Sequence, residues 1–497
     1  MALVYRRHGD ALAISQRASR HSTRCRPRMN MQRLLVVKAQ APPFLGASDP
    51  VPADARACEA PSKSVIRSGQ GYSDAILLQG FAWDSWKQGD GDWYGKVKAH
   101  IPDMQALGVT HVWLPPPSHS VSPEGYLPGQ LYDLTSKYGN LEQLKDLTAA
   151  LQAAGISPMA DIVINHRCAD EQENGVYNSF KDQVDHEGAS IDWGRWAITS
   201  NDPHFNGAGN PDTGADFPAA PDLDHANPEL RAALKDWLSW LQRDVGFRGW
   251  RFDYVRGYDA KFISEYVDAT TGIDSFNVGE YWTEAQWSGP HLEYNQDWAR
   301  QTLCDWVDRC NERCCAFDFP TKSILQEAAR NCQYDRLRDG EGKAPGLMGW
   351  WPAKAVTFVD NHDTGSTQQH WPFPSDHVGL GYAYILTHPG IPCLFWDHVF
   401  VWGKDLREQI SALTALRRRC GVVNDSSLTV VAAEADVYVA KVDGRFGSLI
   451  LKLGPRMELG GLQPAQNDGW ALAAWGGDWA VWEKSTTPPP PPLPAQE

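Results

Sequence analysis

The sequence GWRFD at residues 249–253 is a short apolar run that places an arginine and an aspartate on the same face. Seven comparable runs lie before or after it, separated by longer amphipathic stretches. They begin at Ile76 (ILLQGF), Val109 (VTHVWL), Ala160 (ADIVI), Phe276 (FNVGE), Ala316 (AFDF), Ala355 (AVTFV) and Ile391 (IPCLFW). Eight such strands alternating with helices predict an α/β fold, a parallel (β/α)8 TIM barrel.

The remaining sequence predicts further segments around this barrel. More than eighty residues rich in Gly, Asp, Asn and Pro separate the third and fourth runs and predict an inserted subdomain. After the last helical stretch, alternating runs such as LTVVAA predict a small antiparallel sheet. The expected divisions are 1–72 (transit peptide and disordered linker), 73–410 (barrel, with the insert at about 166–226), 411–484 (C-terminal antiparallel β-sheet domain) and 485–497 (proline-rich tail).

The first 45 or so residues contain many arginines among Ala and Ser, with Asp10 as the only acid. They contain no long apolar stretch of the kind a secretory signal needs, so the composition favours a plastid transit peptide. A basic arm on a cytoplasmic protein is the alternative.

The overall composition limits the partners of the chain. A net charge of -15 disfavours nucleic acid, and no run of about 18 apolar residues is available to span a membrane. The 22 Trp residues offer flat faces on which sugars can stack, although such side chains also fill cores. The ten cysteines are too unevenly spaced for a disulfide framework, and a thiol switch between Cys310 and Cys314 stays open. We expect a monomer.

Three acids follow strands of the predicted barrel. Asp253 ends the fourth strand, Glu280 ends the fifth, and Asp363 follows the seventh. Because the carboxyl ends of barrel strands converge on one face, we expect these acids to share a cleft. Two carboxyl groups about 5 Å apart are what a retaining glycosidase needs, one to attack the sugar and one to protonate the leaving oxygen.

Neighbouring residues suggest how the two acids differ. Arg251 lies two residues before Asp253 on the same strand face, so its charge should keep Asp253 ionised. Glu280 has no adjacent cation in the sequence and is flanked by Tyr281 and Trp282. The sequence therefore predicts a raised pKa for Glu280 and the role of general acid.

Two histidines also follow barrel strands directly, His166 in ADIVINHR and His362 in FVDNHD. As neutral imidazoles at the cleft they could donate hydrogen bonds to sugar hydroxyl groups.

Four motifs occur together in a characteristic order: ADIVINH (160–166), GWRFDYVRGY (249–258), GEYW (279–282) and FVDNHD (358–363). With them the chain resembles the plant-type α-amylases of glycoside hydrolase family 13. The resemblance implies endo-hydrolysis of α-1,4-glucosidic bonds in starch or a related glucan by a retaining mechanism. Asp253 would be the nucleophile, Glu280 the acid/base and Asp363 the stabiliser of the transition state.

The resemblance also implies substrate-binding residues. Arg251, His166, His362 and Tyr126 would line the site of the cleaved sugar, and Trp83 and Trp282 would form further subsites. Trp350 and Trp351, in MGWWPAK, would form a starch-binding platform on the surface.

The same family holds Ca2+ beneath its inserted subdomain, through oxygen ligands. The resemblance assigns a main site to Asn165, Asp212, Asp222 and the carbonyl groups of Ala215 and Gly257, and a second site to Asp202, Asp216, Phe217 and Ala220. At a third family site, within residues 180–192, the sequence departs from the acidic pattern.

Two alternatives remain open at this point. Transferases and debranching enzymes of the family carry the same three acids, so another retaining α-glucan enzyme is one. A non-catalytic starch-binding protein is the other.

Overall fold

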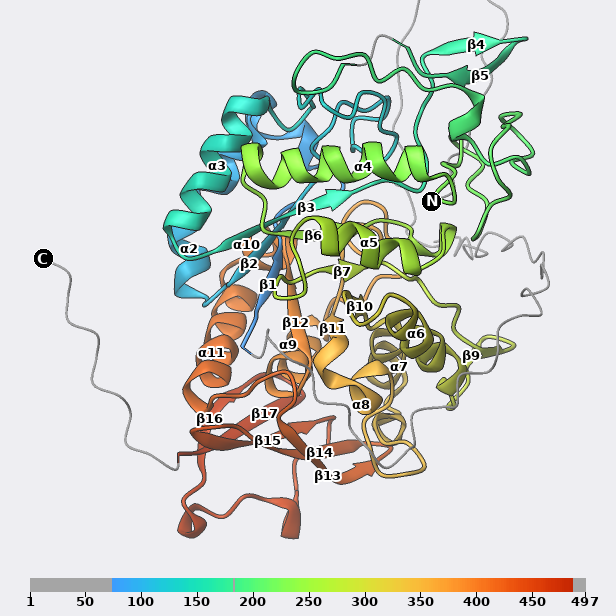
Figure 1. The fold of residues 1–497 in the computed structure, drawn as a ribbon. Helices are drawn as coiled ribbons and strands as arrows, with labels where there is room; N and C mark the ends of the chain where they lie inside the picture. Colours follow the sequence, from blue (N-terminus) through green and yellow to red (C-terminus); the bar gives the residue numbers. More distant parts are fainter. Residues whose placement is uncertain (1–73, 182–183, 486–497) are drawn as a thin grey trace, which may run out of the picture. The chain divides into compact units, whose positions relative to one another are not determined.

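The computed structural model describes residues 74–181 and 184–485, and its central element is a closed barrel of eight parallel strands (Figure 1). The basic arm and the proline-rich tail lie outside these residues. Each strand pairs with the next one along the barrel, and β12 pairs with β1 to close it. The strands are β1 (Leu77–Gln79), β2 (His111–Leu114), β3 (Ser157–Ile162), β6 (Gly249–Phe252), β7 (Val278–Gly279), β10 (Cys315–Phe317), β11 (Ala355–Phe358) and β12 (Ile391–Phe395). The predicted TIM barrel is confirmed, and its eight strands are the eight expected runs.

Helices cover the outside of the barrel, and local sequence fixes where several of them begin. Asn140 and Gln143 form a capping box at the start of α3, and the Asn227 side chain caps α4 just before Pro228. The helices are α1 (Trp93–Ala99), α2 (Ile101–Ala106), α3 (Leu141–Ala153), α4 (Pro228–Trp240), α5 (Lys261–Ala269), α6 (Asp297–Arg309), α7 (Phe319–Asn331), α8 (Leu347–Trp350), α9 (Val378–Thr387), α10 (Trp396–Phe400) and α11 (Lys404–Cys420). Within the described ranges, none is both long and apolar enough to cross a membrane.

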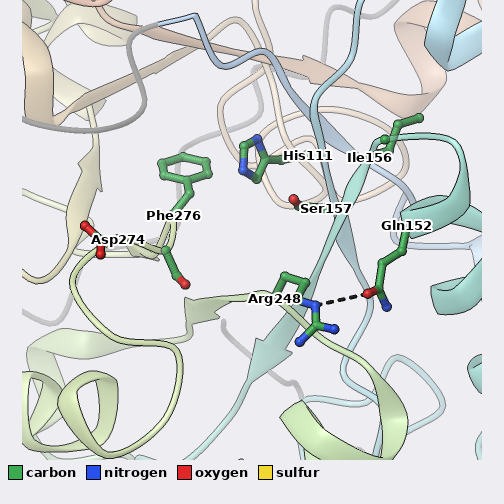
Figure 2. A pocket seen from close by; sticks show the side chains of 9 residues that line it. His111, Gln152, Ile156, Ser157, Arg248, Asp274 and Phe276 are labelled. Atoms are coloured by element: carbon green, nitrogen blue, oxygen red, sulfur yellow. Dashed lines mark hydrogen bonds between the residues drawn. The ribbon is translucent and has the colours of Figure 1, made fainter.

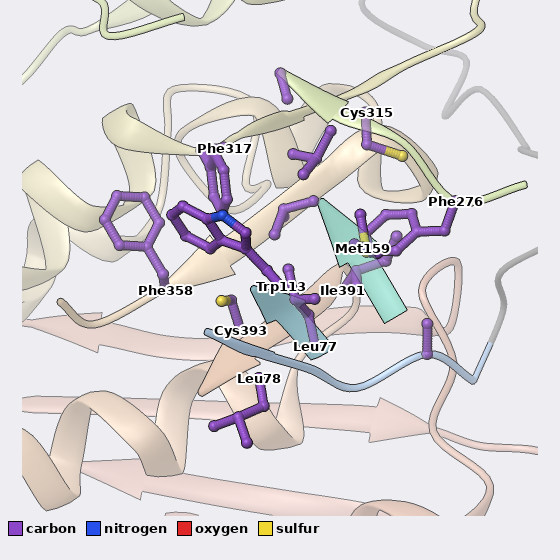
Figure 3. Close-up of a cluster of buried hydrophobic side chains, with 14 of the residues drawn as sticks. Leu77, Leu78, Trp113, Met159, Phe276, Cys315, Phe317, Phe358, Ile391 and Cys393 are labelled. Carbon is purple, nitrogen blue, oxygen red and sulfur yellow. The ribbon is translucent and has the colours of Figure 1, made fainter. Parts of the chain in front are cut away.

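The interior of the barrel is filled with side chains. Trp113 from β2 packs against Phe317 from β10 with ring centroids 5.6 Å apart, and Phe317 meets Phe358 from β11 edge to face at 5.7 Å. Figure 3 shows these rings within a larger apolar cluster. Because the barrel is a packed core, a substrate can reach polar groups only at its rims.

The chain between β3 and β6 forms the inserted subdomain. Before α4 begins, its described residues include one small hairpin, β4 (Glu171–Glu173) with β5 (Val176–Ser179), and a short 3-10 helix at Arg195–Ala197. Aspartate side chains replace regular strand pairing there: Asp202 accepts hydrogen bonds from the backbone of His204 and Phe205, and Asp224 accepts one from Asn210. A second small hairpin, β8 (Trp287–Ser288) with β9 (His291–Leu292), follows β7.

The C-terminal part is a five-stranded antiparallel sheet, as expected. Its order is β13-β14-β15-β17-β16, and it contacts α9 and α11 of the barrel. The strands are β13 (Ser427–Glu434), β14 (Val437–Asp443), β15 (Gly447–Leu453), β16 (Ala471–Trp475) and β17 (Trp479–Ser485).

The cysteines that the structure describes are all free thiols. Cys310 and Cys314 are both buried, and burial raises the pKa of the Cys310 thiol to about 12 and that of Cys314 well above its ordinary value. Since a thiolate is the reactive form, this environment favours a structural role over a thiol switch.

Candidate active site

The register of the barrel brings three acidic side chains and one arginine together at one rim. Asp161 in β3 pairs directly with Arg251 in β6, and Asp253 and Glu280 are the first residues after β6 and β7. Backbone hydrogen bonds hold these two ends in place, from Asp253 N to Ile162 O and from Glu280 N to Phe252 O, both 2.9 Å. The acids expected at the carboxyl ends of strands four and five therefore lie side by side.

Arg251 is the centre of this cluster. Its fully buried guanidinium donates from Nη1 to Asp161 Oδ1 and to Asp253 Oδ1, both at 2.7 Å, and its Nη2 is 2.9 Å from Glu280 Oε2. The guanidinium carbon also lies 4.7 Å from the centroid of the Trp113 ring, which fixes its plane. One cation thus holds three carboxyl groups in a water-poor site.

The contact between Arg251 and Glu280 corrects the sequence analysis, in which Glu280 had no adjacent cation. The pKa expected for Asp253 also needs revision. Burial outweighs the Arg251 charge and raises the pKa of Asp253 to about 7, whereas burial and the neighbouring carboxylates raise that of Glu280 to about 8. Glu280 has the raised pKa that was predicted, and Asp253 is not held below its ordinary value.

The segment after β11 carries His362 and Asp363. The His362 ring accepts a hydrogen bond at Nδ1 from Gln79 Nε2 at 2.8 Å, which leaves the proton on Nε2, 3.4 Å from Asp363 Oδ2. Burial lowers the pKa of His362 to about 4, so the ring is neutral at physiological pH. Asp363 is partly exposed, and the neutral His362 ring lies beside its carboxyl group.

Three aromatic rings lie beside these acids. The planes of Trp83, Tyr126 and His362 are parallel to within 6°, with centroids 5.2 to 6.1 Å apart. Because the three separations are nearly equal, the rings do not form a single column, and each pair is an offset parallel stack. The Tyr126 hydroxyl donates to Asp161 Oδ2 at 2.8 Å. Trp83 is half-buried, and its role as a sugar platform stays a prediction.

His166 lies at the same rim but is engaged with the protein. Its Nε2 is 2.9 Å from the Tyr126 carbonyl oxygen, and its ring stacks on Phe217 of the insert with centroids 3.7 Å apart. Burial lowers its pKa to about 4, in agreement with the expected neutral form. Its hydrogen bond to sugar stays a prediction, since the described Nε2 is already paired.

The other three tryptophans that were expected to bind sugar differ in how far they are exposed. Trp282 is half-buried and stacks on Phe319 at 4.8 Å, so its subsite role stays a prediction. Trp350 and Trp351 are only 7% and 1% exposed, and the Arg300 guanidinium covers the Trp350 ring at 3.7 Å. The structure therefore contradicts the expectation that these two form an exposed platform.

The expected metal ligands gather in the insert, directly beside His166. Carboxylate oxygens of Asp202, Asp216 and Asp222 lie within 4.8 Å of one another. Within the described residues, no Lys or Arg pairs with these three acids, and burial together with the other carboxylates raises the pKa of Asp222 to about 9. Asp222, which the sequence analysis assigned to the main site, thus lies beside Asp202 and Asp216, which it assigned to the second site.

Asn165 adds an oxygen that points into the same region. Its Nδ2 donates to Asp222 Oδ1 at 3.0 Å, while its Oδ1 is buried without a hydrogen-bond partner. A Cβ atom built on Gly257 would lie 1.9 Å from this oxygen, so only glycine fits there. Ala215 donates from its backbone N to Arg256 O at 3.0 Å, which places it beside Gly257. An orphaned carbonyl oxygen amid uncompensated carboxylates fits a hard divalent cation.

The other assigned residues of this region take different places around the acids. The pKa of Asp212 is raised by burial, and its Oδ1 accepts from the backbone of Thr213 and Gly214. Phe217 and Ala220 are buried, and Phe217 N donates to Asp222 Oδ2 at 3.0 Å.

Two functional contacts were missed by the sequence analysis. Asp161 has no assigned role there, yet it accepts from Arg251, Tyr126 and Trp113. Gln79, in β1, sets the proton position of His362. A charged or amide residue within an otherwise apolar barrel strand is the signal that could have identified both.

A hollow of about 500 Å³ at the opposite end of the barrel does not belong to this site (Figure 2). It is lined by residues at or just before the starts of strands, including His111, Ser157 and Arg248. Arg248 donates there to Gln152 Oε1 at 3.0 Å. The catalytic acids lie at the carboxyl ends of the strands, where barrel enzymes hold their active sites.

Comparison with known proteins adds independent evidence. Residues 76–301 match the family model of the α-amylase catalytic domain, and residues 419–483 match that of the α-amylase C-terminal β-sheet domain. Alpha-amylase 3, chloroplastic, of Arabidopsis thaliana is 43% identical over 422 residues, which cover 84% of this chain and 45% of that protein. Probable alpha-amylase 2 of the same plant is 45% identical over 421 residues, covering 84% and 95%. The chain thus spans less than half of the first relative and nearly all of the second.

Among solved structures, an Anoxybacillus α-amylase superimposes with a TM-score of 0.59 at 16% identity, covering 84% of this chain and 98% of that one. This likeness supports the fold. A parallel barrel with acids at the carboxyl ends of neighbouring strands fits a glycoside hydrolase of the barrel type. The chain belongs to the α-amylase family, glycoside hydrolase family 13.

Proposed function

We propose that this protein hydrolyses internal α-1,4-glucosidic bonds of starch and related glucans with retention of the anomeric configuration. The observation that carries the proposal is the contact of one buried guanidinium, that of Arg251, with both Asp253 and Glu280. This contact holds two carboxyl groups together at one rim of the barrel, and a double displacement needs such a pair.

In the first step Glu280 donates its proton to the glycosidic oxygen while the Asp253 carboxylate attacks the anomeric carbon. The bond between that carbon and the glycosidic oxygen breaks, the shortened chain leaves with a new hydroxyl group, and a glycosyl ester forms on Asp253. In the second step Glu280 takes a proton from water, whose oxygen attacks the same carbon and releases Asp253. Two inversions restore the α configuration. Asp363 stabilises the positive charge that develops on the sugar ring.

The electrostatics of the site support this division of roles. Burial and the neighbouring carboxylates of Asp253 and Asp363 raise the pKa of Glu280, which favours the protonated form that a general acid needs. Asp253 accepts a hydrogen bond from Arg251 Nη1, and this contact favours the carboxylate form that a nucleophile needs.

The test is the action of residues 74–485 on soluble amylose, followed by iodine staining and by reducing ends. We expect staining to disappear when few reducing ends have formed, because internal cleavage shortens long chains quickly. New products should carry the α configuration in early NMR spectra. Conversion of one chain length into longer ones would indicate a transferase, and bound but intact amylose would indicate a binding protein.

We propose that the insert holds Ca2+ through Asp202, Asp212, Asp216, Asp222, Asn165 and backbone carbonyl groups of Ala215, Phe217, Ala220 and Gly257. When bound, the ion would neutralise the carboxylates and fix the insert. The stack of Phe217 on His166 supports a link between this region and the active site. The role of the ion is structural, and no chemical step passes through it.

We also propose that the N-terminal segment directs the protein to plastids. Its arginine-rich composition supports this, as does the relative whose name describes it as chloroplastic. A fluorescent protein fused to residues 1–72 should accumulate in chloroplasts of leaf cells, whereas the same fusion to residues 30–72 should remain outside. Cytosolic fluorescence of the first fusion would refute the proposal.

A further inference from the structure

Asp363, the proposed stabiliser of the transition state, and its neighbour His362 lie on a segment, residues 360–373, that has no regular structure. Its two ends are joined by the side chain of Asp360. Both oxygens of that carboxylate are 3.2 Å from Phe373 N, and Oδ1 accepts from the Thr364 hydroxyl at 2.8 Å. We name residues 360–373 the catalytic loop. Asp360 closes it.

A single buried cation contacts both ends of this loop. Lys322, from α7, is fully buried, and its Nζ is 3.3 Å from Asp360 Oδ1 and 2.9 Å from the Trp371 carbonyl oxygen. A third contact, to Gln326 Oε1 at 2.6 Å, fixes the direction of the ammonium group. The three protons of the ammonium are thus matched by three acceptors, two of which belong to the catalytic loop.

The other group beside Asp360 supplies no charge. His398 Nε2 is 3.8 Å from Asp360 Oδ2, while its Nδ1 is 2.9 Å from the Tyr382 hydroxyl. Burial lowers the pKa of His398 to about 4, so the ring is neutral. Lys322 is therefore the cation that compensates the buried Asp360 carboxylate, and a buried carboxylate without such a partner is costly.

We propose that Lys322 is a positioning residue, which holds the catalytic loop so that Asp363 and His362 keep their places at the cleft. The proposal rests on the function proposed above for Asp363. Lys322 touches neither residue and acts through Asp360 and the Trp371 carbonyl. Since a displacement of a catalytic group by about 1 Å can cost up to about 100-fold in rate, loosening this anchor should affect turnover more than substrate binding.

The experiment compares Lys322→Met with Lys354→Met in the full chain. Lys354 is a matched control because it is also buried and directly precedes the other end of β11, where its Nζ donates to the Glu312 carbonyl oxygen at 2.5 Å. We expect kcat on soluble amylose to fall by about tenfold or more in Lys322→Met, with KM changed by less than about twofold. Amide hydrogen exchange in residues 360–373 should become faster only in this variant.

If Lys322→Met does not fold, the charge-balanced variant Lys322→Met/Asp360→Asn replaces it, with the same expectation. An equal loss of kcat in Lys354→Met, or unchanged exchange in residues 360–373, would overturn the proposal. The exchange measurement needs no catalysis, so it separates this inference from the role of Asp363. Full activity of Asp363→Asn would refute that role while leaving the exchange result to decide the anchor.

Discussion

Replacing Glu280 with Gln is expected to lower kcat on soluble amylose by about 10³-fold, and replacing Asp253 with Asn by about 10⁴-fold. Glutamine keeps the shape of the acid but has no proton to give to the glycosidic oxygen. Asparagine leaves no carboxylate to form the glycosyl ester. The initial rate of reducing-end release from amylose, at saturating substrate, measures both.

A substrate with fluoride as leaving group separates the two roles. Fluoride departs from α-maltosyl fluoride without a proton, so Glu280→Gln should release a burst of fluoride at close to the native rate and then stall for lack of a base. Asp253→Asn should release none, because the attacking group is gone. Asp274→Asn, an exposed acid on the loop before β7, is the control and should match the native enzyme on both substrates. A burst from Asp253→Asn would assign the nucleophile to another residue.

The sequence predicted the barrel because its strands are buried on both faces. Each strand is therefore an almost uninterrupted apolar run, such as IPCLF in β12, whose five residues are all buried. The acids at the ends of strands followed from that assignment, since parallel strands place their carboxyl ends on one rim. For the same reason, the positions of Asp253 and Glu280 at the rim could be predicted without knowing how the side chains pack.

Contacts between side chains of different strands could not be predicted from the sequence. The partner of Glu280 is Arg251, which comes from the neighbouring strand, so a search of adjacent residues could not find it. Asp161 lies 90 residues before Arg251 and meets it only through the register of β3 with β6. The exposure of Trp350 likewise depends on Arg300, from another helix, whose guanidinium covers it. The sequence motifs thus identified the site residues, whereas the charge partners and the exposure of these residues became known only from the folded structure.

If the insert holds Ca2+ as proposed, removal of the ion is expected to destabilise the protein more than the loss of any single surface contact. Without an ion, Asp202, Asp216 and Asp222 face one another with no Lys or Arg of the described chain to compensate them. An ion present at about 1,000 times its dissociation constant stabilises the folded state by about 4 kcal/mol. We therefore expect chelation to lower Tm by several degrees or more, as measured by circular dichroism with and without added calcium.

A matched pair of variants tests whether these acids hold the ion. Asp222→Asn removes the charge that links the two sets of ligands, and its Tm should respond little to added calcium. Asp274→Asn removes an exposed carboxylate far from the insert in sequence and should keep the native response. If the insert is the only part affected, chelation should increase amide exchange in residues 198–226 before that of the barrel strands, because local opening costs less than global unfolding. An identical calcium response in Asp222→Asn and the native protein would place the ion elsewhere.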